Sequence, residues 1–344
     1  MLIIYLFALL ACFIFLARIV SLFFITSLDK ISGDLRLSSD AAGATLMAAG
    51  SSAPELFVAL FSVLKPGGHQ VIGIGSIVGS ALFNILVITG IAAIIRSSKL
   101  TWQPIIRDLF FYLLAVGLLL YGILDGEFST LEAIGFIAVY IIYVVAVVHW
   151  KKWFPYQDKK FETGNNTECE EKRNITGMFD KLLCFIFPKK KHYYMVFLVS
   201  IIVIAGLSWA LVELAVKISV ILNIPEAIIA LTVIAVGTSI PDLFSSIIVA
   251  RQGRSDMAVT NAVGSNIFDI LIGLGVPFLI FMLINRTVID ASSKDMMSSA
   301  IILFGSVILL ILLLLIKRWK IGKLTGVVLV GLYIFYIVRE ILTI

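Results

Sequence analysis

The sequence TLMAAGSSAPELF at residues 45–57 has a second version in the same chain, TVIAVGTSIPDLF, at residues 232–244. Seven of the thirteen aligned positions are identical. A second matched pair follows: SIVGSALFNIL at residues 76–86 matches NAVGSNIFDIL at residues 261–271 in six of eleven positions. The two pairs are offset along the chain by nearly the same number of residues, which indicates an internal repeat of the whole architecture.

The rest of the chain is mostly apolar. Of its 344 residues, 60% are hydrophobic and only 14% are charged, and the mean hydropathy is +1.07. A chain of this composition lacks the polar surface of a water-soluble domain. Ten apolar runs are long enough to cross a hydrocarbon core of roughly 30 Å. They begin near Leu2, Ser38, Gln70, Arg107, Thr130, Tyr194, Pro225, Asp256, Met296 and Lys323. We therefore predict an all-α membrane protein with ten transmembrane helices.

A polar segment at residues 151–193 divides the predicted spans into five and five. Residues 1–150 would form a first repeat, with its motif at residues 45–86, and residues 194–344 a second repeat, with its motif at residues 232–271. Since each repeat has an odd number of spans, the second copy must enter the membrane upside down, which predicts two inverted five-helix repeats. The segment between them is too short and too polar for a domain with its own core, so we expect a disordered linker or a surface helix.

The basic residues predict the orientation, because Lys and Arg concentrate in cytoplasmic loops. Most of the 27 Lys and Arg residues fall on the side that holds residues 151–193, and the opposite side has only Lys65, Arg286, Lys294 and Arg339. We predict a multi-pass protein of the plasma or cell inner membrane, with residues 151–193 in the cytoplasm and both termini outside. This topology explains the basic pI without a nucleic-acid partner. We expect the protein to lie in the lipid bilayer and to need no obligatory protein partner.

Two acidic residues, Glu55 and Asp242, occupy the same repeat position near the middle of their spans. An ionised side chain there costs several kcal/mol unless it is paired, binds an ion or lines water. Each acid follows a proline, Pro54 or Pro241, whose missing N–H leaves the carbonyl four residues back without its helical donor. Two symmetric carboxylates with no neighbouring Lys or Arg in the sequence predict a cation-binding site.

Other oxygen-bearing side chains accompany the acids in both repeats. Hydroxyl groups within one helical turn of the acids belong to Ser51, Ser52, Thr238 and Ser239. Spacing by four residues places further polar side chains on one helix face in each repeat: Ser76, Ser80 and Asn84 in the first, and Asn261, Ser265 and Asp269 in the second. Carboxylate, hydroxyl, amide and carbonyl oxygens without His or Cys favour hard cations such as Ca²⁺ and Na⁺. Competition of two cations for the same ligands would couple their fluxes.

At these residues the chain resembles the calcium/cation antiporter superfamily, and within it the sodium/calcium exchangers. GSSAPEL with GSALFNIL, and GTSIPDL with GSNIFDIL, look like the two repeats of that family. AAGSSAPE and AVGTSIPD, followed by ARQGRSDMAVTNAVGSNIFDI, are most similar to the potassium-dependent branch and its prokaryotic relatives. The resemblance implies the sodium/calcium exchanger fold, in which the second, third, seventh and eighth helices form the ion site and the first and sixth slide to alternate its access. It implies transport of Ca²⁺ and Na⁺, with K⁺ in some members, and no cofactor or enzymatic activity.

The resemblance also assigns roles to single positions. Glu55 and Asp242 match the acids that bind Ca²⁺. Positions whose side chains or carbonyls bind Na⁺ or Ca²⁺ are matched by Ser51, Ser52, Ser80, Thr238, Ser239 and Ser265, and backbone-carbonyl ligands by Ala48 and Ala235. Asn84 and Asp269 match a pair beside the site. An acid at the second of these positions accompanies potassium dependence in some members and is protonated in others.

Two other functions remain open on sequence alone. In a Ca²⁺/H⁺ or other cation/H⁺ antiporter, Glu55 and Asp242 would exchange the metal ion for protons, although the abundance of hydroxyl oxygens favours sodium. In an intramembrane acid protease the same two residues would be the catalytic pair. The protease is disfavoured because the chain has no GxGD-type signature and because a symmetric site suits transport.

Three other charged residues fall inside predicted spans. Arg18 lies near the cytoplasmic end of the first span, from which its long side chain can reach the membrane surface. Glu213 and Lys217 are four residues apart on one helix face, which predicts a salt bridge near the outer end of the sixth span. We expect structural roles for these residues.

Overall fold

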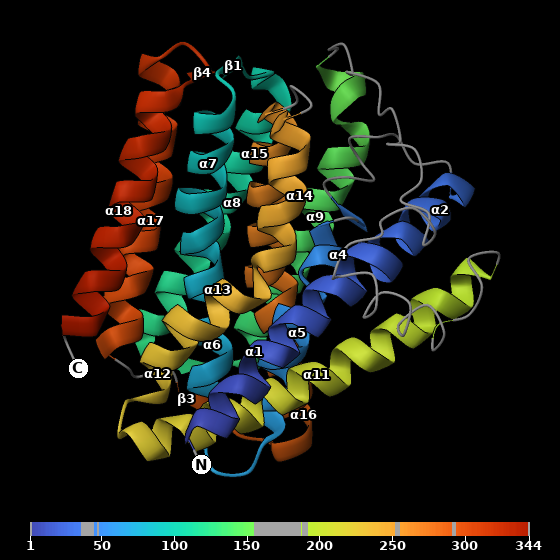
Figure 1. Ribbon diagram of the computed structural model, residues 1–344. Coiled ribbons are helices and arrows are strands. Elements are labelled where there is room, and N and C mark those ends of the chain that lie inside the picture. The colour runs from blue at the N-terminus through green and yellow to red at the C-terminus, as the bar shows by residue number, and fades with distance from the viewer. Residues whose placement is uncertain are drawn as a thin grey trace.

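The computed structural model describes residues 2–35, 45–46, 48–154, 187, 192–251, 255–290 and 294–342. In this part of the chain the protein is a bundle of helices joined by four two-residue strands (Figure 1). Most of the linker predicted at residues 151–193 lies outside the described residues, so the expectation for its conformation stays a prediction. The flanking helices end at Trp153 and begin at Tyr193.

The helices follow the order predicted from the apolar runs, and several contain short π-helical segments, labelled η. In the first half they are α1 Leu2–Ile19, η1 Val20–Phe24, α2 Ile25–Asp34, α4 Ala48–Ser51, α5 Ala53–Leu64, α6 Gln70–Leu82, η3 Phe83–Ile88, α7 Thr89–Ile95, α8 Trp102–Asp125 and α9 Thr130–Trp153. In the second half they are α11 Tyr193–Leu222, α12 Glu226–Ile229, η4 Ala230–Ile234, α13 Ala235–Thr238, α14 Ile240–Arg251, α15 Ser255–Phe268, η5 Asp269–Leu274, α16 Gly275–Asn285, α17 Lys294–Ile316 and α18 Lys323–Leu342.

Eight helices in the described part of the chain are long and apolar enough to cross a membrane. They cover Leu2–Leu28, Gln70–Ile95, Trp102–Asp125, Thr130–Trp150, Tyr193–Leu222, Ala258–Asn285, Asp295–Ile316 and Lys323–Leu342. Two shorter apolar helices, Ala53–Leu64 and Glu226–Thr238, lie in the regions of the second and seventh predicted spans. The start predicted near Ser38 lies outside the described residues. The prediction of an all-helical membrane protein is confirmed.

The second and seventh predicted spans are interrupted at equivalent residues. Ser52 separates α4 from α5 with φ −88° and ψ 5°, and Ser239 separates α13 from α14 with φ −83° and ψ 0°. This conformation lies between the helical and extended regions and is common among active-site residues. Pro54 and Pro241 start the new helices because proline fits the first turn of a helix, where its missing N–H has no acceptor to serve.

The four strands form two small antiparallel sheets that tie the halves of the chain together. In one sheet β1, Ser98–Lys99, pairs with β4, Lys320–Ile321. In the other, β2, Glu127–Phe128, pairs with β3, Ile289–Asp290. The labels β1 and β4 lie at one end of the bundle and β3 at the other, so each end carries one tie between the halves (Figure 1).

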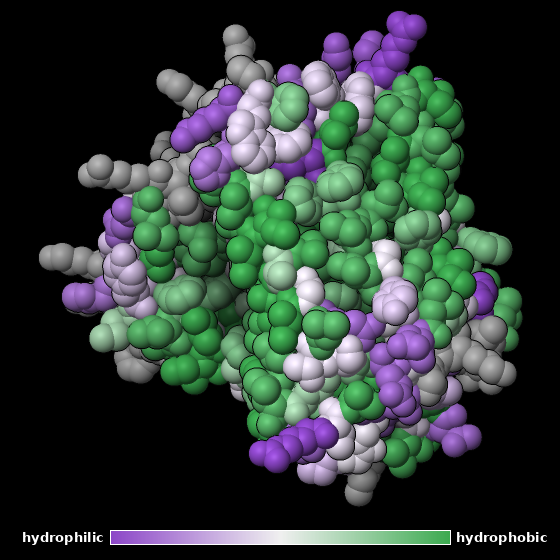
Figure 2. Space-filling model, turned by 180° about the vertical axis from the view of Figure 1, so that it is seen from behind, coloured by the Kyte–Doolittle hydropathy of each residue, from purple (hydrophilic) through white to green (hydrophobic). Residues whose placement is uncertain are grey.

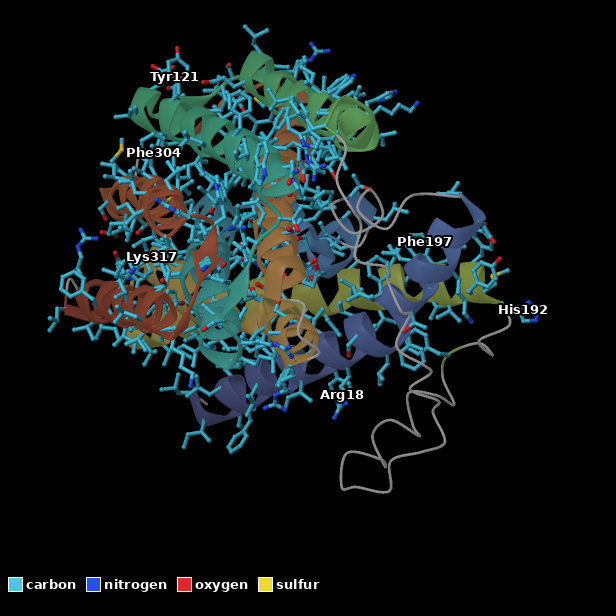
Figure 3. The ribbon with its side chains drawn as sticks, turned by 90° about the horizontal axis from the view of Figure 1, so that it is seen from above. Arg18, Tyr121, His192, Phe197, Phe304 and Lys317 are labelled. Carbon is cyan, nitrogen blue, oxygen red and sulfur yellow. The ribbon has the colours of Figure 1, made fainter. Side chains whose placement is uncertain are left out.

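On one flank of the bundle, α1, η1 and α2 follow one another as one oblique rod, and α11 forms a second rod beside it (Figure 1). Seen from above, Phe197 of α11 and Phe304 of α17 lie on opposite sides of the molecule (Figure 3). The rods take part in one buried apolar cluster, in which the rings of Phe24 and Phe197 stack at 5.2 Å. The same cluster includes residues of α5, α6, α12 and η4, and a larger cluster lies among the other helices. The rods therefore share apolar packing with the interrupted helices.

Apolar side chains cover the sides of the molecule, whereas hydrophilic ones gather toward its upper and lower ends (Figure 2). Large apolar side chains such as Phe7, Phe110 and Ile316 are more than half exposed. A band of exposed apolar side chains between polar ends is what lipid contact requires.

The fourth span and one predicted ion pair differ from expectation. The fourth span begins at Trp102, five residues before the predicted Arg107, because the Arg107 guanidinium is buried against the Asp108 carboxylate at 2.7 Å and so tolerates the helix interior. The predicted salt bridge between Glu213 and Lys217 is wrong.

Glu213 instead pairs with Lys65 at the end of α5, and the Lys217 ammonium lies 5.8 Å from the centroid of the Tyr5 ring. Both partners come from other helices, which a spacing rule within one helix cannot anticipate. Arg18 lies at the outer edge of the molecule seen from above (Figure 3), and its reach to the membrane surface stays a prediction.

Candidate ion-binding site

The twelve residues predicted for the ion site are all buried in the structure. They are Ala48, Ser51, Ser52, Glu55, Ser80, Asn84, Ala235, Thr238, Ser239, Asp242, Ser265 and Asp269. They come from the two interrupted helices and from α6–η3 and α15–η5, which are continuous helices with a π segment. π-Helical turns are frequent at functional sites because they re-aim side chains within a helix.

Hydrogen bonds between hydroxyl groups bring the two halves together. The Ser51 and Ser265 Oγ atoms are 3.2 Å apart, and the Ser80 and Ser239 Oγ atoms are 2.8 Å apart. Each bond joins the interrupted helix of one half to the continuous helix of the other. Gly79 makes this approach possible, because a Cβ added there would lie 2.6 Å from the Ala235 Cβ.

Glu55 lies in the first turn of α5 and is 1% exposed. Its carboxyl group interacts with the hydroxyls of Thr238, from the other half, and Ser80. The carboxyl also lies at the N-terminal, positive end of the α5 dipole. A carboxylate held this way is a strong ligand for a cation that reaches it.

Asp242 lies in the first turn of α14 and is 3% exposed. Its carboxyl group interacts with the hydroxyls of Ser51, from the other half, and Ser265. The arrangement repeats that of Glu55, with one hydroxyl from the opposite interrupted helix and one from a continuous helix. The two carboxyls also interact electrostatically with each other.

Asn84 and Asp269 lie at equivalent places in η3 and η5 and are 0% and 1% exposed. The Asp269 carboxyl interacts electrostatically with Glu55 and Asp242, which makes it a third acidic group of the same cluster. The Ser52 side chain lies near Asp269, but its hydroxyl is outside hydrogen-bonding geometry.

The predicted carbonyl ligands are engaged within their own helices. The Ala48 carbonyl accepts from the Ser51 hydroxyl at 3.2 Å, and the Ala235 carbonyl accepts from the Thr238 hydroxyl at 3.4 Å. Each also accepts from the backbone N–H four residues further on. A carbonyl oxygen has two lone pairs, so a cation could bind there when the serine or threonine hydroxyl turns away.

Several buried oxygen atoms of the cluster have no hydrogen-bond donor among the residues that the structure describes. They are Glu55 Oε2, Ser52 Oγ, Asn84 Oδ1 and both carboxylate oxygens of Asp269. Buried polar atoms are nearly always satisfied in native proteins, so a group of such oxygens calls for a ligand. The helical segments 45–64, 70–95, 225–250 and 258–285 contain no Lys, Arg or His, so their own side chains offer no positive charge.

The acids do not form a cluster of the usual metal-chelating kind. Among the residues that the structure describes, no three His, Cys, Asp or Glu side chains are grouped closely enough to hold one metal ion. A bound cation would therefore need hydroxyl, amide and carbonyl oxygens in addition to the carboxylates, and such oxygen ligands suit Na⁺, K⁺ and Ca²⁺.

One residue of the site was not anticipated. Asn266 is fully buried beside the cluster and bonds to Asn84. In the repeat its counterpart is Ala81, so a search for matched polar positions passes over it. Ser76, by contrast, donates to the Gly73 carbonyl of its own helix, so its hydroxyl is used locally.

Comparison with known proteins gives one family. The family model described as "Sodium/calcium exchanger protein" matches residues 5–149 and 192–342. The sodium/potassium/calcium exchanger 2 of Gallus gallus is 26% identical, with 96% of this chain and 76% of that protein aligned. The sodium/potassium/calcium exchanger 5 of Homo sapiens is 29% identical over 75% of this chain and 66% of that protein.

Two solved structures share the architecture. The sodium-calcium exchanger NCX_Mj is 27% identical, superposes with a TM-score of 0.61, and covers 98% of this chain and 99% of its own. The H⁺/Ca²⁺ exchanger CAX superposes with a TM-score of 0.76 and covers 97% of this chain and 82% of its own, at 17% identity. The second likeness concerns the fold alone.

Proposed function

The chain belongs to the sodium/calcium exchanger family and is a cation/Ca²⁺ antiporter, not an enzyme, and on that premise we propose that it exchanges Ca²⁺ for Na⁺ by alternating access. The observation that carries the proposal is the reciprocal arrangement of Glu55 and Asp242, two buried carboxyls that each lie near hydroxyls from both halves. Hydroxyl and carboxylate oxygens together suit both ions. The alternative of an intramembrane acid protease is not supported, because the relatives are transporters.

The two ions would compete for the same oxygens. Ca²⁺ seeks six to eight oxygen ligands and would take both carboxylates, with Ser51, Ser52, Ser80, Thr238, Ser239 and Ser265 and the carbonyls of Ala48 and Ala235 around them. Na⁺ would bind the same hydroxyls and carbonyls after Ca²⁺ leaves. Because one set of ligands cannot hold both loads at once, inward movement of one ion requires outward movement of the other.

The third carboxyl, Asp269, supports a binding site for a monovalent cation in addition to Ca²⁺. Three carboxyls share the cluster, and Ca²⁺ balances two of them when all are ionised. A monovalent cation beside Asp269 and Asn84 would balance the third. The names of the relatives, sodium/potassium/calcium exchangers, favour K⁺ there.

We propose a ten-helix architecture of two inverted repeats, in which the interrupted helices α4–α5 and α12–α14 supply the second and seventh spans. The pairing of the strands supports it. A two-fold axis in the membrane plane would exchange equivalent connections of the two halves. The connection between α7 and α8, which contains β1, would map onto that between α16 and α17, which contains β3. In the same way β2, between α8 and α9, would map onto β4, between α17 and α18. The sheet β1·β4 would then map onto the sheet β3·β2, as observed at opposite ends of the bundle. The termini would lie outside and residues 151–193 in the cytoplasm.

The rods α1–α2 and α11 are the proposed moving element. The two rods pack on each other through apolar side chains such as Phe24 and Phe197, and a displacement of packed layers is a common form of conformational change. Ser208 of α11 donates to the Pro54 carbonyl at 3.4 Å, so the rods touch the interrupted helix beside Glu55. Sliding at this contact would open the site to alternate sides.

The driving ion is tested with the purified protein in proteoliposomes. We expect ⁴⁵Ca²⁺ uptake into Na⁺-loaded vesicles, no uptake when choline replaces internal Na⁺, and persistence of uptake when a protonophore abolishes the pH gradient. Uptake that needs no sodium and collapses with the protonophore would make the protein a Ca²⁺/H⁺ antiporter instead. Varying K⁺ in the same assay tests the role proposed for Asp269.

A further inference from the structure

A chain of buried amide hydrogen bonds runs beside the proposed site. Asn266 Nδ2 donates to the Ala81 carbonyl at 3.0 Å and to the Tyr112 hydroxyl oxygen at 2.9 Å. Asn84 Nδ2 donates to Asn266 Oδ1 at 2.9 Å. All three side chains in this network are fully buried, so water does not compete for these bonds.

The bonding partners determine which way each amide points. A backbone carbonyl can only accept, so the side of Asn266 that faces Ala81 must be its NH₂ group. Its oxygen then faces Asn84, and Asn84 must present its own NH₂ group to that oxygen. The Asn84 oxygen is therefore turned the other way, where it is buried and has no hydrogen-bond donor in the described part of the chain.

The network also adjoins the third acid of the cluster. Asn266 precedes Asp269 by three residues, so the two side chains lie on one helix face. Tyr112, which accepts from Asn266, interacts electrostatically with Asp269.

We propose that Asn266 is a positioning residue that holds the Asn84 amide with its oxygen toward the ion cluster, and so determines the affinity for a monovalent cation beside Asp269. An amide oxygen is a neutral ligand for hard cations, whereas an NH₂ group in its place would repel them. Without Asn266 the Asn84 amide could rotate. The inference rests on the proposed function, because it names a residue that tunes the proposed site.

The first arm of the test measures ion binding without transport. Ligands that bind the folded state raise its melting temperature, so Na⁺, K⁺ and Ca²⁺ are titrated separately against thermal unfolding in detergent. For Asn266→Ala, which gives the second half the residue type of Ala81, we expect the half-maximal concentration of the stabilising monovalent ion to rise about fivefold, the loss of roughly one hydrogen bond. The half-maximal concentration of Ca²⁺ should differ from that of the wild-type protein by less than about twofold.

The second arm measures ⁴⁵Ca²⁺ exchange in proteoliposomes, where the KM for the monovalent ion should rise while the KM for Ca²⁺ stays. Tyr112→Phe removes one acceptor and leaves the Ala81 carbonyl in place, so we expect a shift of about twofold in the same direction. This milder variant decides the question if Asn266→Ala does not fold. Asn285→Ala is the matched control, because Asn285 is exposed and donates to the Phe281 carbonyl of its own helix.

Equal shifts for Ca²⁺ and the monovalent ions, or unchanged midpoints in both variants, would overturn the positioning role. A wild-type protein that moves no Ca²⁺ would refute the proposed function, and the thermal titrations would still decide on Asn266.

Discussion

The interrupted helices of the two halves bend at Ser52 and Ser239 with nearly the same backbone angles, φ −88° and ψ 5° against φ −83° and ψ 0°, yet the side chains around them differ. The first half carries the longer acid, Glu55, and an amide, Asn84. The second half carries the shorter acid, Asp242, and a third carboxyl, Asp269. The backbone bend is thus alike in the two halves, and the halves differ in the acids and amide that they place beside it.

Loss of either central acid should have the largest effect. We expect Glu55→Gln and Asp242→Asn each to lower Ca²⁺ exchange by about 100-fold or more, because each removes a charge that a buried cation needs, worth several kcal/mol. The measurement is ⁴⁵Ca²⁺ uptake at equal amounts of reconstituted protein. Glu127→Gln and Asp125→Asn, on exposed residues, are the matched controls. Normal uptake by either site variant would show that the halves do not share one site.

Making the halves alike at the third acid should have a smaller and more selective effect. Asp269→Asn gives the second half the amide of Asn84, so only the charge beside the central acids is lost. We expect exchange to continue with its K⁺ stimulation reduced about tenfold, measured as uptake against external K⁺. Loss of all exchange would place Asp269 among the indispensable Ca²⁺ ligands, and an unchanged K⁺ response would remove it from the account.

Removal of equivalent hydroxyls tests how far the symmetry extends. Ser80 interacts with Glu55, and Ser265 with Asp242, so Ser80→Ala and Ser265→Ala should each raise the KM for Na⁺ about threefold to tenfold through one lost ligand. Ser306→Ala is the control, since Ser306 is buried and donates to its own helix. A strong effect of one variant and none of the other would mean that Na⁺ binds on one side only.

The ion pair between Lys65 and Glu213, outside the site, should have the smallest effect on exchange. Lys65 at the end of α5 pairs with Glu213 of the rod α11, and both side chains are partly exposed, so the pair contributes about 0–1 kcal/mol. We expect Lys65→Met and Glu213→Gln to change the turnover rate less than about fivefold and to leave both KM values unaltered. Non-additive rates in the double variant would identify the pair as the cause. A changed KM for Ca²⁺ would link the rods directly to ion affinity.

Much of the site was predictable because its chemistry is local and duplicated. The acids, their neighbouring hydroxyls and the polar faces of the continuous helices were all found by comparing 45–86 with 232–271, and the structure buries and connects them. Eight predicted spans also coincide with long apolar helices, since hydropathy is a property of the segment itself.

The remaining features depend on partners that are distant in the sequence. Asn266 has no polar counterpart in the first repeat, and its role depends on Tyr112 from another helix. Glu213 prefers Lys65, 148 positions away, over the nearby Lys217. The start of the fourth span was placed too late because the charge of Arg107 is neutralised inside the helix. Such contacts are settled by tertiary packing, which spacing rules within one segment do not contain.

Equilibrium ⁴⁵Ca²⁺ binding to the purified protein shows whether the two halves supply one site for which Ca²⁺ and Na⁺ compete. We predict one high-affinity Ca²⁺ per chain, a competitive loss of Ca²⁺ as Na⁺ rises, and no binding by Glu55→Gln or Asp242→Asn. Two Ca²⁺ ions per chain that are lost one at a time in the two variants, or Ca²⁺ binding that Na⁺ does not displace, would contradict it.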